Sequence, residues 1–180
     1  MAAAVGSVQD DFREAMRRLA TTVSIVTVQD GAERHGTTAT AVTSVCMEPP
    51  SILVCINRDS RLHAFMRTQD RFCVNLLHVD NLATARLFSS PLPGPERFAG
   101  GDWQHDAFGV PFLADAQANL FCMKETQIDH GMHTIFIGRV TRARSRPDIS
   151  ALIYADGSYA ACAALEAPAP AQANQPARQI

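Results

Sequence analysis

Hydrophobic and polar residues alternate along this chain in short, β-branched runs, a pattern that predicts strands. The clearest run covers residues 21–29 and ends at Asp30-Gly31, a pair typical of a tight hairpin turn. The same pattern predicts strands over 36–45, 51–56, 71–77, 113–124 and 133–143, and a last hairpin over 153–160 that turns at Asp156-Gly157. Because hairpin signals join several of these strands, we expect an antiparallel barrel or sandwich rather than a doubly wound sheet.

Helical spacing of apolar residues is limited to three short segments. We expect helices after Asp10 and after Ser60, with these two residues as N-caps, and a third helix between Asp80 and Phe88. The predicted fold class is therefore mainly β, with short flanking helices.

Two further segments stand out by composition. Residues 89–111 are rich in Pro and Gly, so we expect a long loop, and long loops in compact domains are often functional. Residues 164–180 are rich in Ala and Pro and are expected to be disordered, which leaves residues 1–163 as a single domain.

Composition and charge narrow the possible partners. Of the 180 residues, 47% are apolar and 19% are charged, and the net charge of -2 gives no electrostatic reason to expect nucleic acid or an anionic membrane surface. No apolar run is long enough to span a bilayer, and the N-terminus lacks the basic and apolar regions of a secretion signal. Five cysteines without a C-x-x-C pair favour buried free thiols and a cytoplasmic location.

The segment from His35 to Asn57 is unusually rich in short hydroxyl residues and has the features of a ligand cradle. On one continuous strand Thr38, Thr40 and Ser44 share a face, and their small neighbours let a planar ring lie close to the backbone. A Thr-rich strand with one solvated face gives the same pattern, so both interpretations stay open. Because the chain has neither a G-x-G-x-x-G motif nor a phosphate loop, any nucleotide must bind without these devices.

The stretch from Asn57 to Arg61 joins a predicted strand to a predicted helix and is a candidate anion site. A helix N-terminus with a hydroxyl cap, here Ser60, and two neighbouring arginines attracts phosphate groups. The alternative is an ordinary capped turn. Since this stretch and the hydroxyl-rich segment flank the same predicted hairpin, we expect them to lie side by side.

Two other motifs contain residues that could bind a metal or a ligand. His130 and His133 beside Asp129 have the spacing of metal ligands, but Gly131 breaks any helix that would align them, and we assign no metal. The alternatives are two loop histidines, or His133 aimed alone at a bound substrate. In the long loop, Arg97 is a candidate phosphate ligand and Phe98 a candidate cover for an aromatic ring, or both are exposed loop anchors. Hydrolytic triads or paired carboxylates do not stand out.

Taken together, these segments resemble the flavin reductase family, and in particular the small reductase component of two-component flavin-dependent monooxygenases. The resemblance covers about residues 11–160 and is carried, in order, by FREAMRRLATTVSIVTV, HGTTATAVTSVCMEPPSILVCIN, RFCVNLL, ERFAG, GMHTIFIGRV and IYADGSYA. It implies a split β-barrel, Greek-key, FMN-binding fold and a homodimer. It also implies hydride transfer from NADH, less often NADPH, to FAD or FMN. The reduced flavin then serves a partner oxygenase that hydroxylates an aromatic substrate.

The resemblance also implies roles for individual residues. Those matching the flavin ring and ribityl contacts are Thr38, Ala39, Thr40, Ala41, Thr43, Ser44 and Val45. Those matching the phosphate end are Cys55, Asn57, Ser60 and Arg61. His133 matches a histidine near the nicotinamide and is the candidate catalytic residue, and Tyr159 matches a position close to the nicotinamide nucleotide.

The sequence departs from the family pattern at two positions. Met132 stands where many members have Asp, and Leu62 stands where many have a phosphate-binding Thr, a role we expect Arg58 or Arg61 to take over. A non-catalytic flavin-binding or flavin-storage protein on the same barrel remains the alternative, because it needs the cradle without His133 or Tyr159.

Overall fold

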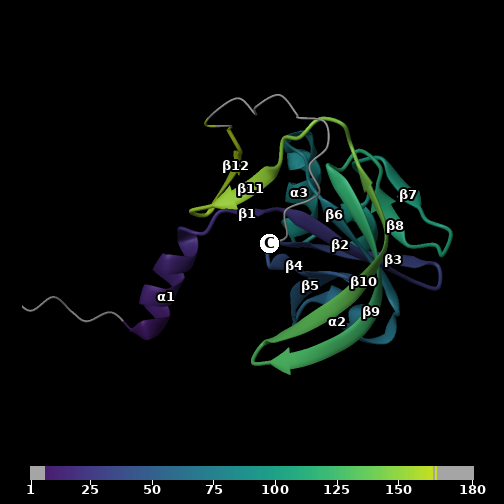
Figure 1. Ribbon diagram of the computed structural model, residues 1–180, viewed down its shortest axis with the longest axis horizontal. Coiled ribbons are helices and arrows are strands. Elements are labelled where there is room, and N and C mark those ends of the chain that lie inside the picture. Colours follow the sequence, from purple (N-terminus) through teal and green to yellow (C-terminus); the bar gives the residue numbers. More distant parts are fainter. Residues whose placement is uncertain (1–6, 164, 166–180) are drawn as a thin grey trace, which may run out of the picture.

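A computed structural model describes residues 7–163 and 165, and the main feature of the fold is one curved antiparallel sheet (Figure 1). Its seven strands follow the order β3-β2-β6-β9-β10-β5-β4, so the predicted mainly β, antiparallel fold is confirmed. The bounds are β2 Ser24–Asp30, β3 Glu33–Ala39, β4 Val42–Met47, β5 Pro50–Asn57, β6 Arg71–Leu76, β9 Ala118–His130 and β10 His133–Ser145.

The sheet is not closed, because its two edge strands are consecutive in the chain but do not pair. Among the described residues, no backbone ladder joins β3 to β4, and only Thr40 and Ala41 separate them. The predicted single strand over 36–45 is therefore wrong. The chain leaves the β3 edge at Thr40, and the Ala41 carbonyl accepts a hydrogen bond from the Cys55 amide (3.0 Å) as β4 begins to pair with β5.

Two smaller sheets flank the barrel. The first has the order β1-β11-β12, with β1 Thr21–Thr22, β11 Leu152–Ala155 and β12 Ser158–Ala161, and it lies beside α3 in Figure 1. The second pairs β7 Trp103–His105 with β8 Pro111–Leu113. The predicted strand over 113–124 thus divides into the end of β8 and the start of β9, and the predicted loop over 89–111 contains β7 and a short helix.

The helices are α1 Val8–Arg17, α2 Arg61–Thr68, α3 Leu82–Ser89 and α4 Gly94–Arg97, with a 3-10 turn η1 Val79–Asn81 before α3. Ser60 caps α2 as predicted, but α1 is capped by Ser7, whose hydroxyl accepts from the Asp10 amide. Asp10 itself lies in the first turn of α1. This helix extends away from the sheets, and none of its residues is buried (Figure 1).

The core fills the inside of the curved sheet and the space beneath α3. Inside the sheet, Val26, Val54, Phe72 and Phe136 are all almost fully buried. A Cβ atom added to Gly138 of β10 would lie only 2.5 Å from the Phe72 ring, so only glycine lets the backbone pack this close to the ring. The pairing of β10 with β9 shifts register at the same place, between Ile137 and Gly138.

Two further expectations from the sequence concern membrane-spanning segments and the C-terminal tail. None of the helices that the structure describes is both long and apolar enough to cross a membrane. The tail expected to be disordered, 164–180, lies outside the described residues except for Leu165.

Candidate functional site

Three of the predicted cradle residues lie together in one cavity with Tyr159. This cavity, which we call the threonine cavity, has a volume of about 390 Å³ and is lined by Val23, Thr38, Ala39, Thr40, Ser89, Tyr154, Gly157 and Tyr159. The Tyr159 ring packs edge-on against Tyr154 at 5.4 Å between centroids, and its hydroxyl lies 3.4 Å from the Ser89 hydroxyl. Small side chains on β3 thus leave room opposite an aromatic wall, as a planar ligand requires.

The rest of the predicted cradle lies on the exposed edge strand β4. Thr43, Ser44 and Val45 are all exposed, and Ala41 is exposed in the connection before them. Because the strand is interrupted at residues 40–41, the alternation that put Thr38, Thr40 and Ser44 on one face does not apply. The structure therefore divides the predicted cradle between a cavity wall and an open strand edge.

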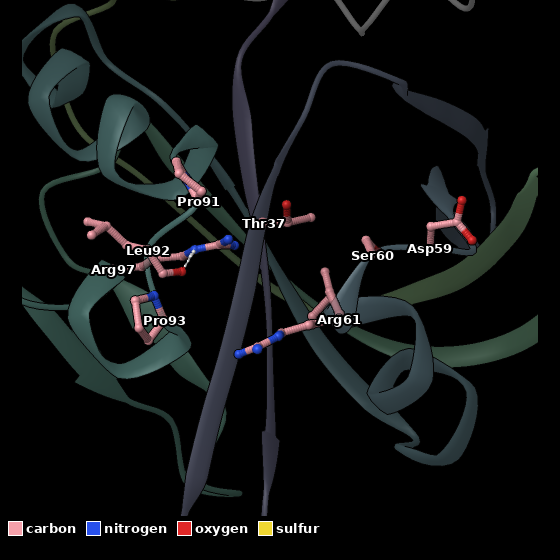
Figure 2. A pocket seen from close by; sticks show the side chains of 9 residues that line it. Thr37, Asp59, Ser60, Arg61, Pro91, Leu92, Pro93 and Arg97 are labelled. Carbon is pink, nitrogen blue, oxygen red and sulfur yellow. Dashed lines mark hydrogen bonds between the residues drawn. The ribbon is translucent and has the colours of Figure 1, made fainter.

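A second cavity of about 360 Å³ adjoins the first through β3 and has a cationic wall (Figure 2). Its lining residues are Thr37, Asp59, Ser60, Arg61, Leu62, Pro91, Leu92, Pro93 and Arg97. Ser60 is held in place as the N-cap of α2, where its hydroxyl accepts from the His63 amide (3.3 Å). Figure 2 shows Arg61 reaching from α2 toward the proline-rich loop on the other side of β3. We call this the phosphate cavity, because a helix N-terminus and arginines favour anions.

Arg97 lies in this cavity but is already engaged by the protein. Its guanidinium donates to the backbone carbonyls of Leu92 (3.0 Å), Ser90 (3.0 Å) and Gly36 (3.3 Å). It therefore fixes the proline-rich loop against β3 and adds positive charge to the cavity from a fixed position.

The prediction that Phe98 covers a bound ring is wrong. Phe98 is only 4% exposed and packs edge-on against Phe88 and Trp103, with ring centroids 4.9 and 4.7 Å away. Apolar burial in this aromatic cluster holds the side chain in the core, so Phe98 is a loop anchor.

Asn57 and His133 form a separate corner of the site. They are partners in the register of β5 and β10, and the Arg58 amide donates to the Met132 carbonyl (2.9 Å) across the same end of the sheet. The Asn57 side chain accepts from the Asp59 amide (2.9 Å), which shapes the turn before Ser60. His133 is exposed and lines neither the threonine cavity nor the phosphate cavity. His130 ends β9 directly opposite it, so neither histidine is in a loop.

A hydrogen-bond chain that runs from buried His63 to the exposed Asp129 carboxylate links this histidine-bearing hairpin to α2. The Thr134 hydroxyl donates to Asp129 (2.6 Å), so His63 must donate from its Nε2 to Thr134 (2.8 Å). The hydrogen bond from Thr134, together with Arg67, holds the pKa of the Asp129 carboxyl below its ordinary value. Burial, with Arg67 nearby, lowers the pKa of His63, so its imidazole is neutral at pH 7.

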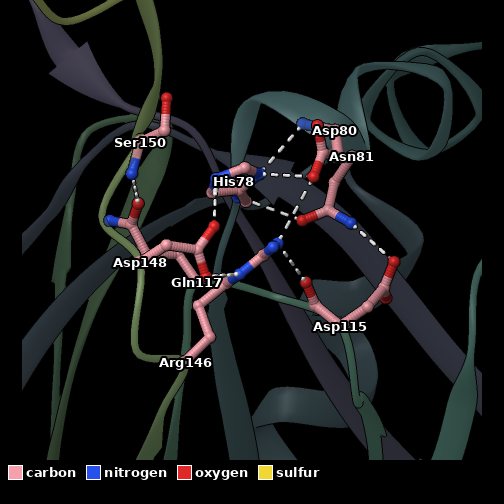
Figure 3. Close-up of polar contacts among 8 residues, drawn as sticks. All are labelled: His78, Asp80, Asn81, Asp115, Gln117, Arg146, Asp148 and Ser150. Carbon is pink, nitrogen blue, oxygen red and sulfur yellow. Dashed lines mark hydrogen bonds and ion pairs between the residues drawn. The ribbon is translucent and has the colours of Figure 1, made fainter.

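A second polar cluster anchors the connection that leads to Tyr159 (Figure 3). Arg146, just after β10, pairs with Asp148 (2.8 Å) and with Asp80 (3.5 Å). The Asp80 amide donates to the buried His78 ring (3.2 Å), and the Gln117 side chain accepts from the Ser150 amide (2.9 Å). These contacts fix residues 146–150 to η1 and so place the β11–β12 hairpin over β3.

The cysteines offer no activated thiol near these cavities. All five are free, and burial raises the pKa of Cys55, which lies half-buried in β5 beside the Ala41 carbonyl. Cys73 and Cys122 are buried as expected, whereas Cys46 and Cys162 are exposed. Among the residues described, no group of three His, Cys, Asp or Glu side chains is arranged to hold a metal ion.

Several cavity residues were not predicted as such. Thr37 belongs to the hydroxyl-rich segment, while Leu92 and its flanking prolines belong to the Pro- and Gly-rich loop for which the composition favours a function. Ser89 and Tyr154 carried no local signal, because only the packing of α3 and β11 against β3 brings them into the threonine cavity.

The open antiparallel barrel thus has a hydroxyl-lined cavity beside a cationic one, a combination that can accommodate a nucleotide without a phosphate loop. Residues 16–163 match the model of the flavin reductase like domain, and the chain belongs to this family. The reductase component of an FADH(2)-dependent resorcinol hydroxylase from a Rhizobium species is 40% identical over 156 residues, which are 86% of this chain and 87% of that protein.

Two further proteins agree with this assignment. An FMN reductase (NADH), RutF, from Stutzerimonas stutzeri is 36% identical over 152 residues, 84% of this chain and 87% of that protein. The crystal structure of BorF, the flavin reductase component of a bacterial two-component tryptophan halogenase, superposes with a TM-score of 0.78 at 32% identity, covering 85% of this chain and 97% of that one. The predicted family and fold are confirmed.

Replacing Thr134 by Val should reduce the loss of stability in acid. A carboxyl whose pKa is lower in the folded than in the unfolded chain stabilises the fold above its unfolded pKa, about 3.9 for Asp. That stability is lost as the pH falls through the folded pKa. Because Val cannot donate to Asp129, the free energy of unfolding in urea should fall less steeply below about pH 4 than in the parent protein. Thr126→Val, an exposed change on β9, is the control, and equal acid slopes for all three proteins would contradict the prediction.

Proposed function

We propose that this protein is an NAD(P)H:flavin oxidoreductase that reduces a flavin with NADH and supplies it to a partner oxygenase. The observation that carries the proposal is the pair of adjoining cavities on β3, one bounded by small residues and tyrosines and the other by Ser60 and Arg61. These residues fit a flavin nucleotide: Thr38 and Ala39 leave space for a flat ring, and the α2 N-terminus suits a phosphate. The family assignment and the relatives' described activities support it.

The protein's part in the reaction is to bind and orient. When bound, the flavin accepts a hydride from the dihydronicotinamide and a proton from solvent, which yields reduced flavin and NAD⁺. Among the residues that the structure describes, Asp59 is the one carboxylate that lines either cavity, at the phosphate end, and the hydride transfer needs no general base beside the flavin ring. Tyr159 and Ser89 bound the space next to Thr38, so they limit how a second ring can stack there.

The decisive measurement is NADH oxidation in air by the purified protein with no flavin, with FMN and with FAD. We expect saturable oxidation that depends on added flavin, because the cavities are open to solvent and let flavin exchange. Flavin binding without NADH oxidation would overturn the proposal and favour a flavin-storage protein on the same barrel.

His133→Ala should weaken NADH use and leave flavin affinity within about twofold. His133 lies outside both cavities, next to Asn57 at the end of β5, so its loss leaves the flavin-facing residues of β3 in place. Loss of one side-chain contact to the nicotinamide nucleotide is expected to raise the NADH KM or slow reduction about tenfold, equivalent to about 1.4 kcal/mol. Stopped-flow reduction measures both quantities. His105→Ala, on the distant strand β7, is the control. An unchanged NADH KM and an unchanged reduction rate in His133→Ala would contradict a role of His133 in NADH use.

We also propose that the protein is a homodimer whose second copy covers β4 and the tip of the β9–β10 hairpin. Met47 on β4 is 81% exposed, and Met132 and Ile128 at the hairpin are 59% and 50% exposed. Met47 lies on the unpaired edge strand β4, and Ile128 and Met132 lie at the hairpin tip near the other end of β5. Folded proteins normally cover exposed strand edges and exposed apolar side chains. The residues predicted to contact flavin on β4 would then face the interface.

Light scattering after size exclusion should give twice the chain mass of 19.5 kDa. Met47→Glu should shift the protein toward the monomer, because a carboxylate is costly to bury without a partner. Ile149→Glu, which changes an apolar side chain that is 86% exposed outside this surface, should leave the dimer intact. A monomeric parent protein at micromolar concentration would contradict the proposal.

A further inference from the structure

Three arginines on the outer face of the main sheet lie over phenylalanine rings. The pairs, each with the distance from the guanidinium carbon to the ring centroid, are Arg71 and Phe108 (3.6 Å), Arg142 and Phe121 (3.9 Å), and Arg144 and Phe112 (5.2 Å). We call these three arginines the arginine strip. A guanidinium group over an aromatic face is attracted by the ring, so it loses less freedom when it binds a partner.

Two of these arginines rest on one buried aromatic base. Phe121 of β9 is the register partner of Arg142 on β10, and Phe112 of β8 packs edge-on against it with ring centroids 5.2 Å apart. Both phenylalanines are only 4% exposed. Because Arg142 and Arg144 are two residues apart on β10, they share one face of the strand and lie side by side above these rings.

Arg71 of β6 extends the strip toward the edge of the sheet. It is the register partner of Met123 in β9, and its ring partner Phe108 is 64% exposed. Two carboxylates lie at this end of the strip. Asp106 accepts a hydrogen bond from the Phe108 amide (2.9 Å) and so shapes the loop, while Asp70 precedes Arg71 in the chain.

The positive charge of the strip is not neutralised by close ion pairs. Within the part of the chain that the structure describes, Arg71, Arg142 and Arg144 take part in no ion pair. Arg139, the preceding arginine of β10, does pair, with Glu125 (2.9 Å). Since like charges on neighbouring positions of a sheet repel one another, a surface of opposite charge that binds here relieves this repulsion.

A protein with exposed carboxylates fits this strip better than a nucleic acid does. Guanidinium groups bind carboxylates through two parallel hydrogen bonds, and arginine and aromatic residues are enriched at protein interfaces. The exposed Phe108 ring adds an apolar contact at the edge of the strip. Domains that bind nucleic acid are basic, whereas this chain has a net charge of -2 and a pI of about 6.3.

The strip remains accessible in the proposed homodimer. The surface assigned to the second copy comprises β4 and the tip of the β9–β10 hairpin, and from His133 at that tip to Arg144 the strand extends over about 35 Å. Figure 1 shows β7 and β8 at the other end of the sheet from the hairpin tip. A partner bound to the strip therefore does not compete with the second copy.

We propose that the arginine strip docks an acidic surface of a protein partner. Arg142 and Arg144 bind carboxylates of the partner, and Phe108 packs against an apolar part of its surface. In the proposed function this partner is the oxygenase, and that identification rests on the proposed function. Opposite charges steer the two proteins together and raise the association rate, so reduced flavin is released close to its acceptor.

The test measures how the full chain binds fluorescently labelled poly-L-glutamate, by anisotropy. We expect binding that weakens about tenfold or more between about 20 and about 200 mM salt, because salt screens exposed charges. Arg142→Glu combined with Arg144→Glu should weaken binding at the lower salt concentration by about tenfold or more, since two attractive contacts become repulsive.

Arg13→Glu combined with Arg86→Glu is the matched control. It makes the same change in net charge at exposed residues of α1 and α3, away from the strip, and should bind within about twofold of the parent protein. Equal losses in the strip variant and the control would overturn the proposal, because net charge alone would then account for binding. No binding of poly-L-glutamate by the parent protein at low salt would overturn it as well.

A second strip variant covers a failure to fold. Urea unfolding shows whether each variant is folded, and Arg142→Gln combined with Arg144→Gln removes the two charges without adding new ones. This variant should also bind poly-L-glutamate more weakly than the control does. If the glutamate variant does not fold, this comparison decides the proposal.

Other occupants of the strip give different results. An oligothymidylate that binds the strip while poly-L-glutamate does not would assign the strip to nucleic acid and overturn the proposal. A parent dimer that becomes a monomer in Arg142→Glu combined with Arg144→Glu would show that a second copy covers the strip, which also overturns it. None of these measurements needs flavin or NADH, so failure of the docking surface and failure of the proposed function can be told apart.

Discussion

The two-residue connection between β3 and β4 is the constraint on which the site depends. The seven-stranded sheet curves so that its two edge strands, β3 and β4, are joined by only Thr40 and Ala41. The two edge strands nevertheless do not pair with each other. Unpaired backbone groups on two neighbouring edges are unfavourable unless something binds to them. The fold therefore leaves an opening at this edge, and the two cavities proposed to bind a flavin lie along β3 beside it.

One strand organises the site because it borders this opening along its whole length. The residues of β3 are short from Gly36 to Ala39, so the threonine cavity and the phosphate cavity both reach the strand. The Gly36 position is also fixed from the core side, where an added Cβ would lie 2.7 Å from the Phe88 ring. Small residues on β3 thus meet two demands: close packing of α3 beneath the strand and space for a ligand above it.

Local signals in the sequence predicted the parts of the site that lie on one segment. Ser60 and Arg61 follow a strand and begin a helix, and both line the phosphate cavity as expected. The sequence could not show that Phe98 is buried against Phe88 and Trp103, since a phenylalanine after an arginine in a Pro-rich loop has the same local pattern whether it is exposed or buried. The stacking of the His35 ring on the Phe65 ring likewise depends on how α2 packs on β3, a contact across thirty residues of chain.

The two arginines of the phosphate cavity, Arg61 and Arg97, differ in how many of their donors are free for a bound phosphate. Arg97 donates to three backbone carbonyls, so its remaining capacity for a ligand is small although its charge persists. Arg61 is exposed, and Asp59 adds a carboxylate to the same cavity. One exposed, solvated cation beside a negative charge is a weaker anion site than a buried, bidentate pair. A weaker anion site agrees with the proposed function, in which reduced flavin passes to a partner, because a tightly held product would limit turnover.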